Sequence, residues 1–263
     1  MAILKPFLTY EQQLDRLINY HKLSVSDKQR ALRVLSEVNY YRLSAYGIGL
    51  YQKHDPEQFL PHVTFDHIYR LYQFDAQLRN ALMPVIEVIE IELRTRIAHY
   101  FCQKYGAEGY TDPNNFVKKQ NKNGVDLFFI QDSNIHREID RRSSVPFIKH
   151  HIDNYNGQFP LWVLIDIFSF GMLSSFYALM HHADQKAVAA LYGLTDAKTL
   201  NGWIRSLCEI RNICAHYSRL YNMPLSSRPK LFKEHQQYAK YRLFPVVLVI
   251  RRLAYNKPEW TTF

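Results

Sequence analysis

An arginine, an asparagine and a histidine lie close together in the stretch EIRNICAHYSRLYN, residues 209–222. Arg211 and Asn212 are adjacent, and His216 follows in the same stretch. A guanidinium binds a phosphate through a planar fork of N–H donors, and an imidazole exchanges protons near neutral pH. An arginine and a histidine that share one phosphodiester therefore have the chemistry to cleave it. The alternative is that they are unrelated neighbours on a helix.

The R-x4-H spacing is weak evidence by itself, because arginine and histidine are both frequent in this chain. The chain contains three such pairs, Arg16/His21, Arg94/His99 and Arg211/His216. The second pair is embedded among acidic residues, and the first lies on a short N-terminal helix. The third pair is therefore the strongest candidate.

The sequence predicts a long helix over residues 196–218 that positions this pair, with Thr195 as its N-cap. At about 100° per residue, the helix has an apolar stripe and an opposite polar stripe. The apolar stripe contains Leu200, Trp203, Leu207, Ile210, Cys214 and Tyr217, which we expect to be buried; the polar stripe contains Arg205, Glu209, Asn212, His216 and Arg219. Arg211 lies at the flank, about 140° from His216.

Helix signals also dominate the rest of the chain. Thr9-x-x-Gln12 and Ser26-x-x-Gln29 resemble capping boxes, and they predict helices over 10–22 and 27–38. Residues 39–47 are aromatic and predict helical or turn-rich structure. Pro84 is expected to divide the region 65–104 into helices over 65–82 and 84–104. Further predictions are a mobile loop over 106–132, a helix from a Ser133 cap to residue 151, a short helix from Asp184 to Gly193, and a last helix over 240–255.

No segment shows convincing strand alternation, so the predicted fold class is all-α. The run LWVLIDIFSFGMLSSFYALM, residues 161–180, is long enough to cross a membrane. It contains Asp166 and Gly171, and Ser169 resembles an N-cap, so we interpret it as two short buried helices. The N-terminus MAILKPFLTY has no long apolar core, and we do not expect it to be a signal peptide.

The net charge of +9 points to a polyanionic partner, most often nucleic acid, although a basic protein without such a partner is the plain alternative. Basic residues are densest from Arg219 to Lys257. None of the three cysteines lies in a C-x-x-C pair, which fits a reducing cytoplasm.

Common catalytic motifs are missing from the sequence, including phosphate-binding glycine loops and H-E-x-x-H. The His pairs 150/151 and 181/182 point about 100° apart on a helix, so we predict exposed histidines and no metal site. Glu90 and Arg94 form an i,i+4 pair, which is typical of a helix-stabilising ion pair.

RNICAHYSRLYN resembles the R-N-x-x-A-H-x-x-R-L-x-N signature of the Abi-like family, the AbiD/AbiF type of abortive-infection protein. The blocks LTYEQQLDRL, LSEVNYYRLSAY, TFDHIYRLYQFDAQLR, IEVIEIELRTRIAHY and PLWVLIDIFSFGMLS resemble other blocks of that family in the same order. The resemblance covers about residues 5–225. It implies membership of the HEPN superfamily, with one elaborated domain: an N-terminal helical part, about 1–60, and a HEPN-like bundle, 61–263, with additional N- and C-terminal helices.

The resemblance also implies a metal-independent endoribonuclease in phage defence that needs no cofactor. The catalytic residues would be Arg211, Asn212 and His216. Arg205, Arg219 and Tyr217 would bind RNA. Because the chain has one convincing motif, a homodimer is implied. Two alternatives stay open: a non-catalytic protein that holds a small noncoding RNA, and a scaffold without a nucleic-acid role.

Overall fold

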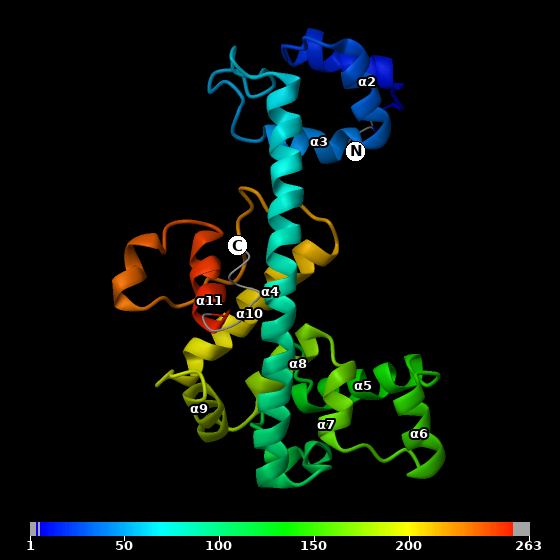
Figure 1. Cartoon of the computed structure of the whole chain (residues 1–263), viewed down its shortest axis with the longest axis vertical. Coiled ribbons are helices and arrows are strands. Elements are labelled where there is room, and N and C mark those ends of the chain that lie inside the picture. Colours follow the sequence, from blue (N-terminus) through cyan, green and yellow to red (C-terminus); the bar gives the residue numbers. More distant parts are fainter. Residues whose placement is uncertain (1–3, 5, 255–263) are drawn as a thin grey trace. The chain divides into compact units, whose positions relative to one another are not determined.

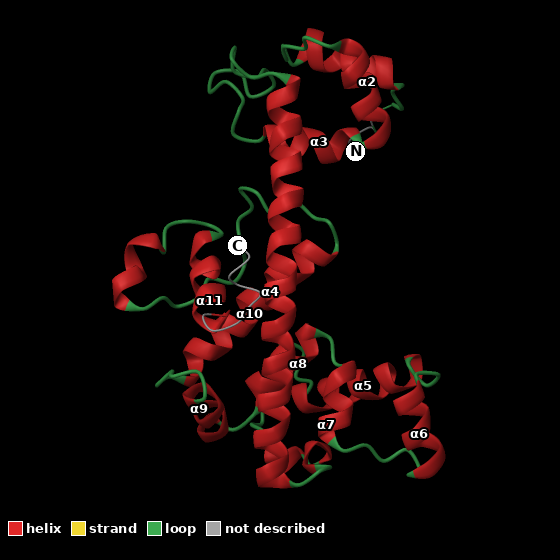
Figure 2. Cartoon of the chain, in the orientation of Figure 1, coloured by secondary structure: helices red, strands yellow, loops and turns green. Residues whose placement is uncertain are grey.

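Helices joined by turns and loops build the whole of the described chain (Figure 1). The structure is a computed structural model, and it describes residue 4 and residues 6–254. The α-helices are α1 (Tyr10–Asp15), α2 (Lys28–Glu37), α3 (Tyr40–Ser44), α4 (Phe65–Tyr105), α5 (Leu127–Arg141), α6 (Pro146–Asn154), α7 (Leu161–Leu164), α8 (Phe170–Leu179), α9 (His182–Ala190), α10 (Ala197–Ala215) and α11 (Phe244–Ala254). Extended pairing in these residues is limited to isolated bridges (Figure 2), which confirms the predicted all-α class.

Contacts between residues divide the chain into two compact units. Unit 1 contains residues 1–80 and Tyr217–Tyr221, and unit 2 contains residues 81–216 and 222–263. Helix α4 contributes residues to both units, and the boundary falls after Asn80. The prediction of one elaborated domain stays a prediction.

In unit 1 the predicted helix starts are confirmed, with one change of cap. At α1 the Gln12 side chain accepts from Thr9 N at 2.9 Å, and the Thr9 side chain accepts from Gln12 N at 3.3 Å. The predicted capping box is therefore present. At α2 the cap is Asp27, whose carboxylate accepts from Arg30 N at 2.9 Å. The prediction of a Ser26 capping box is therefore wrong, since the neighbouring carboxylate takes that position.

A buried carboxylate, Asp75 of α4, holds the segment Tyr217–Tyr221 within unit 1. It accepts hydrogen bonds from the backbone N–H groups of Leu220 and Tyr221, the latter at 2.6 Å. The hydroxyl of Tyr46 also donates to it at 2.6 Å, and Arg79 forms an ion pair with it. Burial raises the pKa of Tyr46 to about 12, and the bond to Asp75 acts in the same direction.

Helix α4 continues through Pro84, so the predicted break there is wrong. A proline removes one backbone N–H and crowds the carbonyl four residues earlier, which here belongs to Asn80. Apolar residues on both sides of the proline are fully or almost fully buried, among them Leu82, Val85 and Ile86. Because burial favours the helix on either side, the local cost of the proline does not end it.

In unit 2 an aromatic cluster joins the end of α4 to α8 and to the segment before α5. The ring centroids of Phe101, Phe116 and Phe176 lie 5.0–5.3 Å apart, and all three side chains are buried. Phe116 belongs to the predicted loop over 106–132, which is shorter than expected. The loop ends where α5 begins at Leu127, capped by Asp126, and the prediction of a Ser133 cap is therefore wrong.

Two other expectations for unit 2 change in detail. The predicted helix to residue 151 is two helices, α5 and α6, because Pro146 begins α6 in the N-terminal position that proline favours. Asp184 does not open α9; its fully buried carboxylate accepts from Tyr100, Lys104 and Tyr105. The last helix begins at 244, with Pro245 in its first turn, and residue 255 of the predicted range lies outside the described residues.

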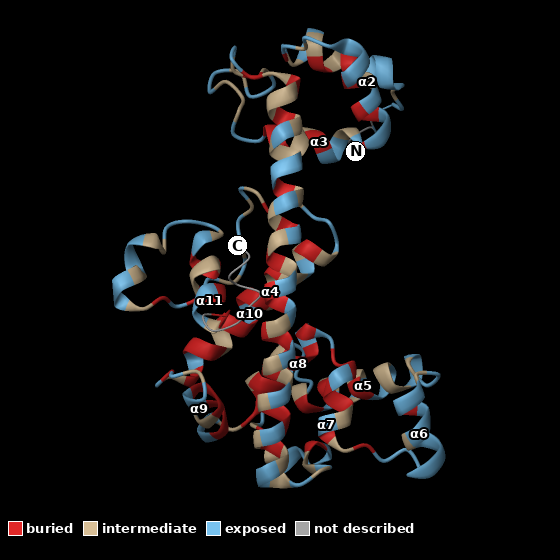
Figure 3. Cartoon of the chain, in the orientation of Figure 1, coloured by how far each residue is buried: buried red, intermediate tan, exposed pale blue. Residues whose placement is uncertain are grey.

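The apolar run 161–180 forms two short helices, α7 and α8, as predicted. Ser169 caps α8 by accepting from Met172 N at 3.1 Å. Six of the ten residues of α8 are buried (Figure 3), whereas α7 buries Leu161 and Leu164 and leaves Trp162 56% exposed. Among the described residues, no helix is both long enough and apolar enough to span a membrane.

Candidate active site

Arg211 and Asn212 lie on the second half of α10, and His216 directly follows this helix, which packs against α8, α9 and α11 in unit 2. The helix begins after Asp196, whose side chain accepts from Lys198 N at 3.0 Å, so the cap is one residue later than predicted. The predicted apolar stripe is buried over its first five members, Leu200, Trp203, Leu207, Ile210 and Cys214. This packing fixes the helix and leaves the opposite stripe to present polar side chains.

Helix α10 ends at Ala215, with His216 as its C-cap. The backbone N–H of His216 donates to Asn212 O at 3.0 Å. Tyr217 then takes a left-handed conformation with φ of 54°, which stops the helix. The side chain of Tyr217 is 69% exposed, so the prediction that it is buried is wrong. The wheel assumed a helix to residue 218, and beyond its actual end the wheel no longer applies.

The guanidinium of Arg211 is held by a carboxylate on another helix. One carboxylate oxygen of Glu90 of α4 forms an ion pair with Nε of Arg211 at 3.3 Å, and the other oxygen pairs with Arg94. Arg94 also donates to the carbonyl oxygen of Ile165 at 2.6 Å. The Glu90 side chain is only 8% exposed, whereas that of Arg211 is 33% exposed. One buried carboxylate is therefore shared by two guanidiniums, and the three side chains together keep one surplus positive charge.

Because Glu90 contacts Nε, the two Nη groups of the Arg211 guanidinium are left to bind another anion. Nη1 of Arg211 lies 3.4 Å from Oδ1 of Asn212, which is a long hydrogen bond. The Asn212 amide also donates to Sγ of Cys208 at 3.7 Å. Burial, with Glu90 nearby, raises the pKa of the Cys208 thiol, so this cysteine is protonated at neutral pH. The structure thus brings Arg211 and Asn212 together at a partly open, positively charged position.

His216 is exposed at the end of the same helix. Its ring makes no hydrogen bond or ion pair with any other described residue, so no protein group ties it to Arg211 or Asn212. The two side chains of the R-x4-H pair are thus linked by the helix backbone alone. They lie about one and a half turns, or about 7.5 Å, apart along the axis.

The three residues predicted to bind RNA belong to different units. Arg205 is exposed on α10, about three turns before His216. Arg219 and Tyr217 belong to unit 1, where the Arg219 guanidinium donates to Ala45 O and Tyr217 O accepts from Arg42. Arg219 is past the end of α10, and the predicted polar stripe therefore stops at His216.

Glu209, the one acid of the predicted polar stripe, has a local structural role. Its two carboxylate oxygens accept from the backbone N–H groups of Ser226 and Ser227, at 2.7 and 2.9 Å. This fixes the loop that follows the motif. Across the described residues, no group of three His, Cys, Asp or Glu side chains is arranged to hold a metal ion.

A family model for the Abi-like protein family matches residues 33–222. The chain belongs to the Abi-like family. The match includes the whole 209–222 stretch and Glu90, and it assigns the chain to proteins of the abortive-infection type. It begins later than the resemblance seen in the sequence, and it leaves residues 223–263 of the Abi-like chain outside. No curated protein and no solved structure gave a match.

Sequence reasoning missed the second role of Glu90 in the Abi-like chain. The sequence predicts Glu90 only as the i,i+4 partner of Arg94. The ion pair is present, but the same carboxylate also orients Arg211. The signal available in the sequence was the helical spacing, which puts Glu90 four residues after Ile86 and three before Leu93, on the same helix face as these apolar residues. A carboxylate on an apolar face needs a cationic partner.

Proposed function

We propose that this Abi-like chain is a HEPN-type, metal-independent endoribonuclease that acts in phage defence. In the reaction, the 2′-hydroxyl of a ribose loses its proton and attacks the adjacent phosphorus. The bond from phosphorus to the 5′-oxygen breaks, and that oxygen takes up a proton. The products are a 2′,3′-cyclic phosphate and a free 5′-hydroxyl, so atoms and charges balance without a further reactant.

In this proposal His216 moves the protons and Arg211 stabilises the charge that develops on the phosphate oxygens. The observation that supports it most is that Glu90 forms an ion pair with Nε of Arg211, while the Arg211 side chain stays 33% exposed and His216 is exposed. A guanidinium that is already oriented loses less entropy when it binds a phosphate. Asn212, beside Arg211, would donate to a phosphate oxygen or orient the imidazole.

A second copy of the chain completes the proposed site. Arg211 and His216 diverge by about 140° around α10, so one helix cannot readily surround a phosphate with both. In a symmetric dimer each copy would supply one face of the cleft, and Arg205 would extend it along the RNA. The oligomeric state in solution tests this part directly.

The test is cleavage of total RNA in the presence of EDTA by the wild type, Arg211→Ala and His216→Ala. We expect cuts with cyclic phosphate ends from the wild type and at least about a hundredfold slower cutting by either variant. His99→Ala is the matched control, because His99 is the exposed histidine of the other R-x4-H pair in unit 2. Undiminished cutting by His216→Ala would show that the proposal is wrong.

The same experiment separates the alternative function. If neither wild type nor variants cut RNA, yet the wild type binds RNA with an affinity that falls as salt rises, the chain is a non-catalytic RNA holder. If binding is also missing, no nucleic-acid role remains. A substrate with deoxyribose at every position should resist cleavage in all cases, because it lacks the attacking hydroxyl.

A further inference from the structure

Three large aromatic rings form a cluster just before and at the start of α11, outside the residues that the family model matches. The ring of Tyr238 lies 5.0 Å from that of Phe244 and 6.4 Å from that of Tyr241, and Tyr241 and Phe244 are also 6.4 Å apart. Tyr241 is 50% exposed and Phe244 is 43% exposed. Single exposed aromatics are common, but a contiguous group of them marks an interaction surface.

Aliphatic side chains make the core contact between α11 and the rest of unit 2. One face of the helix supplies Val246, Val249 and Ile250, all of which are buried, and α11 packs against α10. The aromatic cluster therefore stays at the surface while aliphatic side chains make the core contact. The exposed parts of the Tyr241 and Phe244 rings are apolar, flat surface on which a flat ligand can stack.

The surroundings of the cluster are basic. From Lys233 to Arg252 the chain has five basic residues and one acid, Glu234. The Lys240 ammonium lies 5.4 Å from the centre of the Tyr241 ring, and Arg242 donates to Asn222 O, which fixes its position. A ligand that combines flat rings with regularly spaced negative charges fits this pattern.

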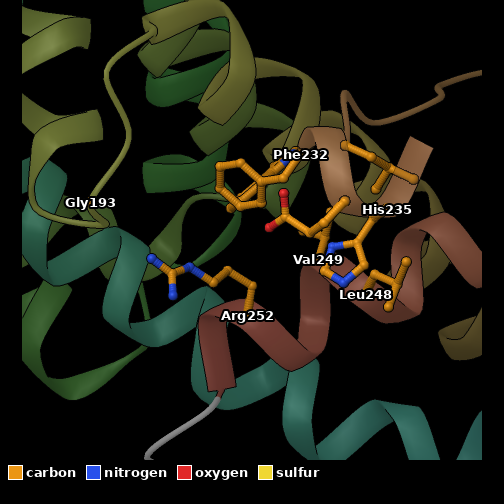
Figure 4. A pocket seen from close by; sticks show the side chains of 9 residues that line it. Gly193, Phe232, His235, Leu248, Val249 and Arg252 are labelled. Carbon is orange, nitrogen blue, oxygen red and sulfur yellow. The ribbon is translucent and has the colours of Figure 1, made fainter.

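A cavity of about 310 Å³ lies next to the cluster, and His235 connects the two. Its ring lines the cavity and is also 6.4 Å from the ring of Tyr238. Phe232 and Arg252 line the same cavity (Figure 4), with the guanidinium 5.9 Å from the centre of the Phe232 ring. An aromatic ring beside a guanidinium provides a stacking surface and hydrogen-bond donors for one nucleobase.

We propose that residues 232–252 form a binding surface for single-stranded RNA, on which successive bases stack on Tyr238, Tyr241 and Phe244 and one base enters the cavity beside Phe232. Lys240 neutralises the phosphates between the stacked bases. This deepens the proposed function, on which it rests for the identity of the nucleic acid, by naming where an unpaired strand is held. Paired bases cannot stack on the rings, so duplex RNA binds this surface through charge alone.

The test uses fluorescence anisotropy of a labelled 15-nucleotide single strand with 2′-O-methyl riboses, which the proposed reaction cannot cleave. The double variant Tyr241→Ala/Phe244→Ala should bind at least about tenfold more weakly than the wild type. Tyr241→Trp should keep wild-type affinity, because the ring face is retained. Phe129→Ala is the control, since Phe129 is 59% exposed elsewhere in unit 2.

A second readout separates stacking from charge. Lys240→Gln should lower the slope of log affinity against log salt concentration by about one, because one phosphate contact is lost. The ring variants should leave this slope unchanged. Equal affinity of the wild type and a correctly folded Tyr241→Ala/Phe244→Ala variant overturns the proposal, as does loss of affinity in Phe129→Ala to the same extent. Because the strand is uncleavable, these results do not depend on whether the chain is a nuclease, which the EDTA experiment decides.

Discussion

The carboxylate of Glu90 and the Nε of Arg211 lie 3.3 Å apart, and this ion pair joins α4 to α10. Glu90 comes from the middle of a 41-residue helix, and Arg211 comes from the family signature more than a hundred residues later. The same carboxylate pairs with Arg94. The orientation of the motif arginine thus depends on a residue that lies outside the motif.

The variant Glu90→Gln keeps the size of the side chain but should hold the Arg211 guanidinium less firmly in its orientation. We expect RNA cleavage to fall about tenfold with little change in RNA affinity, because Arg211 keeps its charge and loses its fixed direction. The free energy of unfolding should fall by roughly 1–3 kcal/mol, since two guanidiniums lose a buried charged acceptor. Single-turnover kinetics and urea unfolding measure the two effects.

Glu92→Gln is the matched control for that change. Glu92 is on the same helix and pairs with Arg96 at 2.7 Å, but both side chains are more exposed. An exposed pair of this kind contributes about 0–1 kcal/mol. If Glu92→Gln reduced cleavage as much as Glu90→Gln, the specific role of Glu90 would be refuted.

Asp75→Asn should destabilise unit 1 strongly. The carboxylate is fully buried and pairs with Arg79, so the variant leaves a buried guanidinium without its counter-charge. We expect the free energy of unfolding, measured with urea, to fall by about 3–5 kcal/mol. Asp66→Asn, which breaks the exposed pair with Arg30, should cost less than about 1 kcal/mol. Similar losses of unfolding free energy in the two variants would contradict the structural importance of Asp75.

Asp184 predicts a specific sensitivity to acid. Burial by itself would raise the pKa of this carboxyl, but hydrogen bonds from Lys104, Tyr105 and Tyr100 outweigh burial and hold the pKa below its ordinary value of 3.8. The stabilisation is therefore present above that value and is lost as the pH falls through the lowered pKa of the folded state. We expect the wild type to lose stability more steeply than Asp184→Asn below about pH 4. The unfolding free energy of both proteins is measured with urea at each pH. Parallel pH curves for the wild type and Asp184→Asn would show that Asp184 does not cause the acid sensitivity.

Two glycine replacements should change the free energy of unfolding in opposite directions. A Cβ on Gly47 would lie 2.6 Å from the ring of Phe59, which is buried and stacked on Tyr51. Gly47→Ala should therefore cost about 1–3 kcal/mol through overpacking. A Cβ on Gly202 in α10 would meet nothing within 4 Å, and Gly202→Ala should add about 0.5–1 kcal/mol. Thermal unfolding of both variants gives the comparison, and a stabilised Gly47→Ala would show that the Phe59 ring can move aside.

Local signals in the sequence predicted local structure well. The capping box at Thr9 and the cap at Ser169 are present because each depends on hydrogen bonds within a few residues. Predictions failed where burial decided the outcome. Pro84 lies inside α4, since apolar contacts on both sides favour a continuous helix. Phe116 lies in a segment of loop-like composition, yet its ring is in the core.

The candidate site was predictable only in part. The signature residues Arg211, Asn212 and His216 were found from their pattern, and the family assignment is confirmed. The pairing of Glu90 with Arg211 was not predictable, because it requires knowledge of which helices meet. The exposure of Tyr217 was missed because a helical wheel cannot show where its helix stops.

The backbone of Tyr217 has consequences beyond the end of α10. A left-handed conformation is disfavoured for a side chain with a Cβ by about 1 kcal/mol, and glycine would adopt it freely. Tyr217→Gly should relax this strain, and little packing would be lost from a ring that is 69% exposed and stacks on no other described aromatic. In the proposed function, the exposed ring is available to a base of the RNA, and the strain in the backbone would be the cost of holding the ring there.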